Sequence, residues 1–215
     1  MLYNLEAVKA NIRNRDGKRV YYLGKSDQLT SEARDYLNSQ RIEILPAHMA
    51  KPQQYKLLGG GYLTEKPEHM THLHGDVLVF KTHPRIGFRG AMDCLEAALL
   101  LCGQAVSPIL ELARRLIRCE VMDEPVGEFT LYGLTEEEQR KRSHFPQDYY
   151  GQPHFMPDFS DGEYLLRLNY ARCAARSAEL AAAKAFPEGQ RMDIQKALNR
   201  MSSMLYILMI QEKAR

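Results

Sequence analysis

The chain has 215 residues, and its 29 basic side chains nearly balance its 27 acidic ones, so the formal net charge is +2 with histidine neutral. This balance excludes a protein that binds nucleic acid mainly through bulk charge, and it excludes an acidic, disordered tail protein. Hydrophobic residues make up 45% and charged residues 26% of the chain, which are the proportions of an ordinary folded protein.

The first 50 residues alternate between strand-like and helix-like patterns. Residues 18–23 (KRVYYL) are rich in strand-forming residues, and residues 41–45 (RIEIL) alternate between polar and apolar side chains. Between them, residues 30–40 have the capping threonine and the apolar spacing of a helix. The sequence therefore predicts a small α/β appendage over residues 1–50.

The next segment is rich in residues that break regular structure. Residues 46–68 contain three prolines and the run Gly59-Gly60-Gly61, and they show little periodicity. Such composition is typical of linkers and loops. We therefore interpret residues 51–75 as a linker or a mobile loop.

From residue 76 onward the pattern is helical. Pro84 stands where a first-turn proline belongs, and long stretches repeat apolar residues at helical spacing. The connection over residues 123–160 is irregular apart from one short helix. The predicted helices span residues 84–102, 108–122, 135–142, 161–186 and 190–213. We expect a mainly α protein, in which residues 76–215 form a bundle of four to five helices.

Cysteine usage and hydropathy indicate the compartment. The four cysteines all fall in predicted helices and form no C-x-x-C pair, which predicts reduced, buried thiols. No apolar run approaches the roughly 20 residues that a membrane-spanning helix needs, and the N-terminal segment lacks an apolar signal region. We expect a cytoplasmic protein with neither a membrane span nor a nucleic-acid partner. The cysteines are Cys94, Cys102, Cys119 and Cys173.

Three predicted helices carry ordered polar stripes. Periodicity alone makes a solvated surface the simpler interpretation of such a stripe. Asparagine and serine among Leu, Met and Ile in the last helix instead favour a partly buried cleft. A cleft with arginines, an amide and hydroxyls suits a polyanion such as a nucleotide triphosphate. The stripes are Arg85, Arg89, Asp93 and Glu96; Asn169, Arg172, Arg176 and Glu179; and Asn199, Ser202, Ser203 and Tyr206.

Several common functional motifs are absent. The sequence has neither of the usual glycine-rich nucleotide fingerprints, no helical E-x-x-H pair and no G-x-S-x-G. His69, His72 and His74 lie close together and leave a metal site open as an alternative. One such cluster on a predicted strand or loop is weak evidence, so we prefer exposed or hydrogen-bonding histidines.

Short motifs along nearly the whole chain resemble those of ATP:corrinoid adenosyltransferases, most closely the ethanolamine-utilization type. The closing Leu198-Asn199-Arg200-Met201-Ser202 is similar to that family's L-N-R-L-S, and the N-terminal LTSEARDYLNSQ also resembles this branch. The other matching segments are Thr71-His72-Leu73, Lys81 to Arg89 with Met92-Asp93, Glu124 to Gly127, Gly133 to Thr135, and Arg176 to Glu179.

The resemblance implies a specific reaction and assembly. The family moves the 5′-deoxyadenosyl group of ATP to cob(I)alamin, with Mg²⁺, giving adenosylcobalamin and triphosphate. Its helical bundles assemble as homo-oligomers with ATP held between subunits, and a trimer is favoured over a dimer. Implied partners are a corrinoid reductase and the ethanolamine ammonia-lyase machinery, and association with a bacterial microcompartment is a further expectation.

The resemblance also implies roles for individual residues. Asp93 and Arg176 would form the family's catalytic pair across a subunit contact. Phe155 would be the aromatic residue under the corrin ring. Because Co(I) is itself the nucleophile, no general base is required, and the protein must instead position ATP and neutralise the departing polyphosphate. The predicted ATP-binding residues are Lys81, Arg85, Arg172, Arg176 and Asn199.

The chain departs from the family pattern in ways that affect these predictions. Relatives often carry a metal-binding His and Cys cluster before the T-H-L motif, but residues 46–70 contain no cysteine, so we predict no metal site. The family's phosphate loop is not recognisable, and Leu180 replaces an arginine one turn after Arg176. A non-enzymatic cobalamin carrier or regulator and a structural helical adaptor are the alternatives. Retention of Asp93, Arg176 and Asn199 favours the enzyme.

Overall fold

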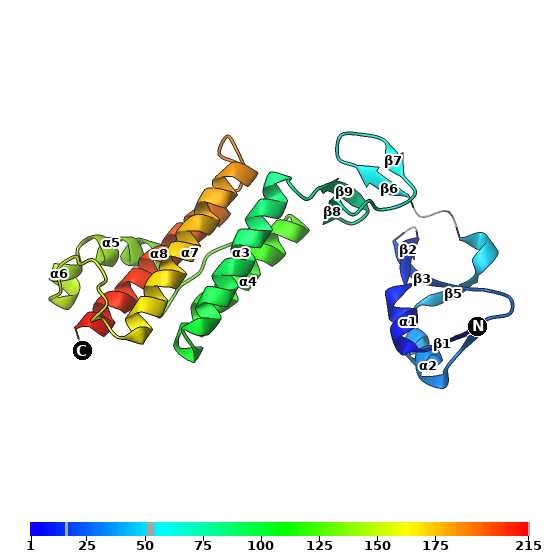
Figure 1. The fold of residues 1–215 in the computed structure, drawn as a ribbon, viewed down its shortest axis with the longest axis horizontal. Coiled ribbons are helices and arrows are strands. Elements are labelled where there is room, and N and C mark those ends of the chain that lie inside the picture. Colours follow the sequence, from blue (N-terminus) through cyan, green and yellow to red (C-terminus); the bar gives the residue numbers. More distant parts are fainter. Residues whose placement is uncertain (16, 51–53, 215) are drawn as a thin grey trace. The chain divides into compact units, whose positions relative to one another are not determined.

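The structure is a computed structural model that describes residues 1–15, 17–50 and 54–214. The chain divides into two units, Met1–Gln54 and Tyr55–Arg215 (Figure 1). The first is a small α/β unit, and the second combines a four-stranded sheet with long helices. This confirms a mainly helical protein with a small N-terminal region of strands and helices.

The N-terminal unit is built around strand β3. β3 pairs antiparallel with β2 and parallel with β5. The Thr30 side chain caps α2 by accepting a hydrogen bond from the Ala33 N–H at 3.3 Å, and Ala33 and Leu37 are fully buried. The predicted strand, helix and strand are thus confirmed. The elements are β1 (Leu2–Tyr3), α1 (Leu5–Ala10), β2 (Arg13–Arg15), β3 (Lys18–Leu23), β4 (Gln28–Leu29), α2 (Ser31–Ser39), β5 (Glu43–Pro46) and the 3₁₀ turn η1 (Ala47–Met49).

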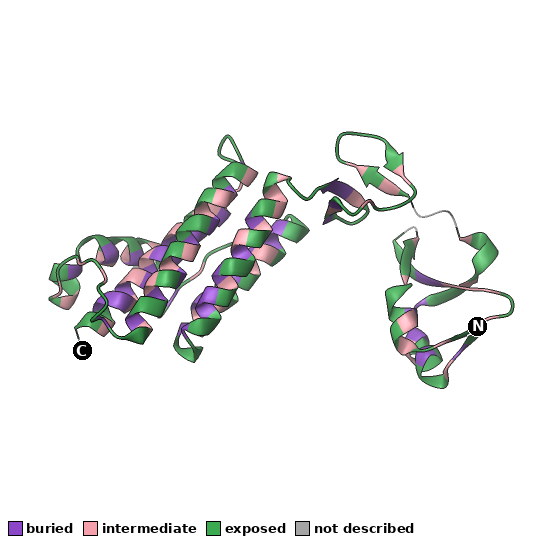
Figure 2. Cartoon of the chain, viewed as in Figure 1, coloured by how far each residue is buried: buried purple, intermediate pink, exposed green. Residues whose placement is uncertain are grey.

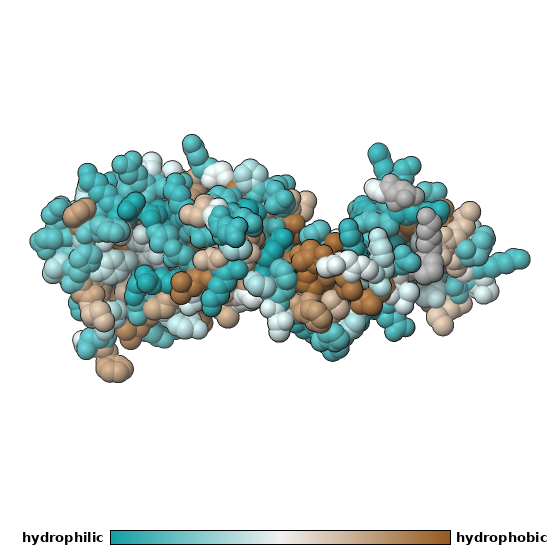
Figure 3. All heavy atoms as spheres, turned by 90° about the horizontal axis from the view of Figure 1, so that it is seen from above, coloured by the Kyte–Doolittle hydropathy of each residue, from teal (hydrophilic) through white to brown (hydrophobic). Residues whose placement is uncertain are grey.

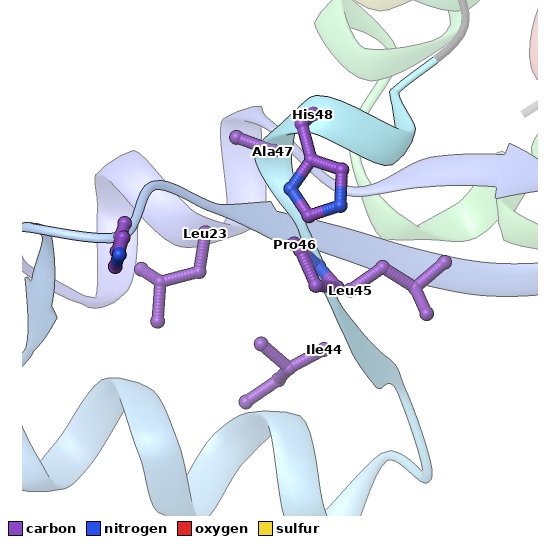
Figure 4. Close-up of a pocket in the computed structure, with 7 residues that line it drawn as sticks. Leu23, Ile44, Leu45, Pro46, Ala47 and His48 are labelled. Atoms are coloured by element: carbon purple, nitrogen blue, oxygen red, sulfur yellow. The ribbon is translucent and has the colours of Figure 1, made fainter.

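A hollow of about 520 Å³ lies at the carboxyl ends of the parallel strands β3 and β5. Figure 4 shows the apolar side chains of Leu23 and Ile44 facing this space, with His48 near its edge. None of the residues predicted to bind ATP or the corrinoid lines this hollow.

Residues 55–80 form a sheet where we expected a linker or mobile loop over residues 51–75; residues 51–53 lie outside the described part of the chain. The strands are β6 (Tyr55–Leu57), β7 (Tyr62–Leu63), β8 (Met70–His74) and β9 (Val77–Phe80), in the order β7-β6-β9-β8. The glycines that suggested a linker make the turn between β6 and β7, where Gly60 and Gly61 have φ of +98° and +89°. Strands of two to five residues are too short to show periodicity.

Apolar side chains remain exposed on this sheet. Leu58 and Phe80 are 54% and 59% exposed, whereas Leu78 and Val79 are buried. The view in Figure 3 shows apolar side chains gathered over these strands, while the face of the helical part seen there is mainly hydrophilic.

Long helices make up the rest of the second unit and enclose one continuous core (Figure 1). α7 packs against both α3 and α8, and α4 packs against α3. The short helix α6 was not predicted, because it lies in the irregular connection. The elements are α3 (Pro84–Leu101), the 3₁₀ turn η2 (Gln104–Val106), α4 (Ser107–Met122), α5 (Glu136–His144), α6 (Pro146–Tyr150), α7 (Glu163–Ala185) and α8 (Met192–Lys213).

Alanines line the inner face of α7. Four of them are fully buried, and Figure 2 shows the buried positions repeating along this helix. A face without bulky side chains lets neighbouring helices approach closely. We expected this helix to begin at residue 161, but α7 begins at Glu163 with Gly162 at the capping position. Asp161 instead accepts a hydrogen bond from the Asp158 N–H at 2.7 Å and pairs with Lys213. The buried alanines are Ala171, Ala175, Ala178 and Ala182.

The cysteines are all free, but only two are buried. Cys102 and Cys119 are enclosed, as expected, whereas Cys94 and Cys173 are exposed on α3 and α7. Within the described residues, no helix is both long and apolar enough to cross a membrane.

Candidate functional site

The polar stripes of α7 and α8 meet in one open pocket of about 190 Å³. Arginines come from α7, hydroxyl groups from α8, and further polar groups from the end of α5 and from the connection that precedes α7. The predicted cleft is therefore present, and these two stripes are not merely solvated surfaces. The lining residues are Ser143, His144, His154, Arg172, Arg176, Ser202, Ser203 and Tyr206.

The two arginines in this pocket have no carboxylate partner within residues 1–15, 17–50 and 54–214. Arg172 donates two hydrogen bonds to the amide oxygen of Asn169, at 3.2 and 3.1 Å, and its guanidinium lies 5.9 Å from the centroid of the Tyr206 ring. Arg176 is exposed and makes no ion pair within the described residues. Two positive charges that the protein leaves without acidic partners are available to an anionic ligand.

Asn199 lies beside this pocket on α8, but its side-chain amide is already held on both sides. Its Nδ2 donates to Glu179 Oε1 at 2.9 Å, and its Oδ1 accepts a hydrogen bond from Arg200. Arg200 is buried, and burial lowers the pKa of its guanidinium; nearby Arg140 lowers it further, against the opposing effect of Glu136 and Glu179. The amide therefore belongs to a connected polar network and is not a free group.

The arginines of the α3 stripe bind a buried carboxylate of the protein itself. Glu120 of α4 is fully buried, and it accepts hydrogen bonds from Arg85 Nε at 2.6 Å and Arg89 Nε at 2.7 Å. Arg85 also donates to the Glu120 carbonyl at 3.0 Å, and Arg89 donates to the Leu73 carbonyl at 2.7 Å. Arg85, predicted to bind ATP, thus joins α3 to α4 in this structure.

Lys81 and Asp93 lie on the surface. Lys81 forms an exposed ion pair with Glu68 at 3.0 Å, and that hydrogen bond lowers the pKa of the Glu68 carboxyl. Asp93 is exposed on α3, and neither it nor Arg176 has an ion-pair partner among the described residues of this chain. A pair between subunits stays a prediction, because one chain does not test it.

Phe155 is half-buried against α8. Its ring lies 6.0 Å from that of Tyr206, at an interplanar angle of 25°, and Lys213 Nζ lies 5.7 Å from its centroid. The sequence did not point to Ser143, His144 and His154. Ser143 and His144 are the last two residues of α5, just beyond the predicted helix end at residue 142, and His154 lies in an irregular segment that has no periodicity to assign its side chain to a face.

The three clustered histidines do not converge in the structure. His69 stacks on Phe80 at 5.6 Å, and His72 contacts the Tyr55 ring edge-on at 5.6 Å. Among residues 1–15, 17–50 and 54–214, no three His, Cys, Asp or Glu side chains gather in a way that could hold a metal ion. The absence of a metal requirement stays a prediction.

The segment that supplies most of the pocket residues matches a known class of protein. Residues 153–212, which include α7, α8 and the segment with Phe155, match the family model of the cobalamin adenosyltransferases. The chain is 30% identical to the corrinoid adenosyltransferase EutT of Salmonella typhimurium, over 97% of this chain and 91% of that protein. It is 29% identical to EutT of Escherichia coli K12, over 94% of this chain and 89% of that protein. The chain belongs to the corrinoid adenosyltransferase family.

Proposed function

We propose that the protein transfers the 5′-deoxyadenosyl group of ATP to cob(I)alamin and so supplies adenosylcobalamin for ethanolamine utilization. The observation that carries the proposal is the pocket between α7 and α8, where Arg172 and Arg176 have no carboxylate partner among the described residues. This pocket lies largely in the segment that matches the family. Guanidinium groups in this arrangement stabilise a polyphosphate that gains charge as it departs.

The proposed reaction is a nucleophilic substitution at the C5′ carbon of ATP. The electron pair of Co(I) forms the Co–C bond. The bond between C5′ and the triphosphate oxygen breaks at the same time, and triphosphate leaves with the electron pair of that broken C–O bond. No proton moves at the reacting carbon, and no general base is needed. Arg172 and Arg176 hold the leaving group, and the helices hold the ribose carbon in line with the cobalt.

Mg²⁺ would accompany ATP in this reaction and partly neutralise the triphosphate. Glu179 fits a role in holding it, because this carboxylate lies one helical turn from Arg176 and is oriented by Asn199 at 2.9 Å. Mg²⁺ prefers oxygen ligands and is usually bound by one or two carboxylates together with phosphate oxygens.

We also propose that a second copy of the chain completes the site. Ligand pockets usually enclose about 300–1,000 Å³, and the open pocket of one chain, about 190 Å³, is too small to enclose ATP. Asp93 and Arg176 are both exposed and without partners in the described part of the chain, so they are available to pair across a subunit contact. The bundle would then assemble as a homo-oligomer, with a trimer favoured over a dimer.

The other predicted contacts differ in how well they suit ATP and the corrinoid. Lys81 would exchange only an exposed partner, Glu68, for a phosphate, whereas Arg85 would have to leave the buried Glu120. Lys81 is therefore the stronger candidate. Phe155, with Met156 and Phe159 nearby at 88% and 100% exposure, offers apolar surface for the lower corrin face.

The cellular setting is part of the same proposal. The protein would act in the cytoplasm in association with a microcompartment, where a corrinoid reductase supplies Co(I) and ethanolamine ammonia-lyase uses the product.

Anaerobic mixing with ATP and chemically reduced cobalamin tests the proposal. The absorbance of the Co–C product should appear with wild-type protein and with Arg118→Gln, a variant of an exposed arginine on α4. Arg172→Gln and Arg176→Gln should both slow product formation. Binding of cobalamin without any Co–C product would refute the enzyme and favour a carrier or regulator.

A further inference from the structure

Tyr206 of α8 contacts groups on two sides of the candidate site. Its ring stacks on His154 at a centroid distance of 5.7 Å and an angle of 7°, and on Phe155 at 6.0 Å. The guanidinium of Arg172 lies 5.9 Å from the centroid of the same ring. One side chain thus touches both the residue proposed to face the corrinoid and a residue proposed to face the polyphosphate.

The hydroxyl of Tyr206 makes a directed chain of hydrogen bonds. The Phe155 N–H donates to this oxygen at 3.4 Å, and the oxygen lies 3.0 Å from His154 Nδ1. His154 Nε2 lies 3.2 Å from the His144 carbonyl, which can only accept, so Nε2 carries the proton. In the neutral imidazole Nδ1 is then an acceptor, and the Tyr206 hydroxyl donates to it. The Tyr206 hydroxyl therefore accepts a hydrogen bond from the Phe155 N–H and donates one to His154, the preceding residue.

The neighbouring side chains explain why such anchoring matters. Phe155 is half-buried, but Met156 beside it and Phe159 are almost entirely exposed, so this apolar segment has little cover of its own. An aromatic ring holds a flat ligand well only when its own position is fixed before binding.

We propose that Tyr206 is a positioning residue whose hydroxyl fixes Phe155 for the corrinoid, while its ring supports Arg172. The inference rests on the proposed function, and it goes beyond it by assigning corrinoid affinity to one oxygen atom that acts through the position of Phe155. Removal of that oxygen alone should weaken corrinoid use and leave ATP use nearly intact.

Tyr206→Phe is the decisive variant, because it removes the hydroxyl and keeps the ring. The KM for cob(I)alamin should rise about 5- to 30-fold, the effect of losing one or two hydrogen bonds. The KM for ATP should change less than about 2-fold, and hydrogen exchange at the Phe155 amide should become faster, since that N–H loses its acceptor. Tyr132→Phe is the matched control: its hydroxyl donates to the Ala105 carbonyl at 2.6 Å, and its loss should change neither KM.

The outcomes separate this inference from the proposed function. Wild-type protein that makes no adenosylcobalamin contradicts the proposed function, and exchange at the Phe155 amide still tests the anchoring. An active wild type with unchanged corrinoid KM in Tyr206→Phe overturns the positioning role. An equal rise in both KM values also overturns it, because the hydroxyl would then support the pocket as a whole. Melting temperatures of both variants, expected to lie within about 6 °C of wild type, show that folding is retained.

Discussion

Two pairs of arginines on neighbouring helices differ in how their positive charge is balanced. Arg85 and Arg89 of α3 share the fully buried carboxylate of Glu120, at 2.6 and 2.7 Å. Arg172 and Arg176 of α7 open onto a polar pocket and have no carboxylate partner among the described residues. Both pairs recur at helical spacing in the sequence, so spacing alone does not tell them apart.

The difference lies in where the neutralising charge comes from. In the first pair the protein supplies it, and the arginines join α3 to α4. In the second pair a ligand must supply it, which leaves those arginines free to bind an anion. The following predictions test this distinction, from the largest expected effect to the smallest.

Glu120→Gln should be the most damaging change. It leaves two partly buried guanidinium groups without their counter-charge, and the loss of one partner of a buried ion pair costs about 3–5 kcal/mol. For a protein of this size, the melting temperature should fall by roughly 6–20 °C. Glu111→Gln, an exposed position on the same helix, is the control and should melt like wild type. Equal melting temperatures would show that α3 and α4 do not depend on this pair.

Arg176→Gln should reduce activity without reducing stability. A lost hydrogen bond to a charged group is worth about 1.5–3 kcal/mol, so kcat/KM for ATP should fall about 10- to 150-fold. The melting temperature should stay unchanged, because the side chain is exposed. Arg85→Gln, tested in parallel, should lower the melting temperature. If Arg85→Gln instead left stability intact and reduced ATP use, Arg85 would bind ATP and would not be needed to join α3 to α4.

Asn199→Ala tests the polar network beside the pocket. Alanine is the better helix former by up to about 0.7 kcal/mol, which by itself predicts a slight gain in stability. The contacts predict the opposite, because Glu179 and Arg200 each lose a partly buried partner, at a cost of about 1–3 kcal/mol. Calorimetry should show a melting temperature several degrees lower. Gln211→Ala, an exposed position on the same helix, controls for helix propensity and should not lower it.

The smallest effect concerns pH and the ion pair between Arg191 and Asp193. Burial alone would raise the pKa of Asp193, but hydrogen bonds from Arg191 and from the Val126 and Ile194 N–H groups outweigh burial and lower it. A folded pKa below the unfolded value, about 3.9, adds stability above that value and loses it as pH falls. The stability difference between wild type and Asp193→Asn should therefore be constant above about pH 5 and shrink below about pH 4. Urea unfolding across this range measures it, and a difference that does not change with pH would contradict this account.

Local patterns were enough to predict much of this architecture. The starts and ends of α3, α4 and α8 follow from caps, prolines and 3.6-residue spacing. The sheet over residues 55–80 could not be predicted, because its strands have only two to five residues and the β6–β9 pairing joins residues as far apart as Lys56 and Val77. For the same reason the spacing of Arg85 gave no sign of Glu120, which lies 35 positions away on another helix.

The candidate site was predictable in part. The stripes of α7 and α8 identified Arg172, Arg176 and Tyr206 as neighbours of one cleft, and the structure brings them together. The arrangement around Asn199 was not predictable, since the partners that fix its amide come from two helices. His154 lies in an irregular segment, so only the folded chain assigns it to the pocket.

The alanine face of α7 limits how this protein can change over evolution. Ala171, Ala175, Ala178 and Ala182 are fully buried against neighbouring helices, so any larger side chain there must push those helices apart. Substitutions on the opposite face of the same helix, which carries the exposed Arg176 and Leu180, cost far less folding stability. A lineage descended from this chain would therefore acquire new substrate preferences through the outward positions of α7, while its inward positions preserve the spacing on which the pocket depends.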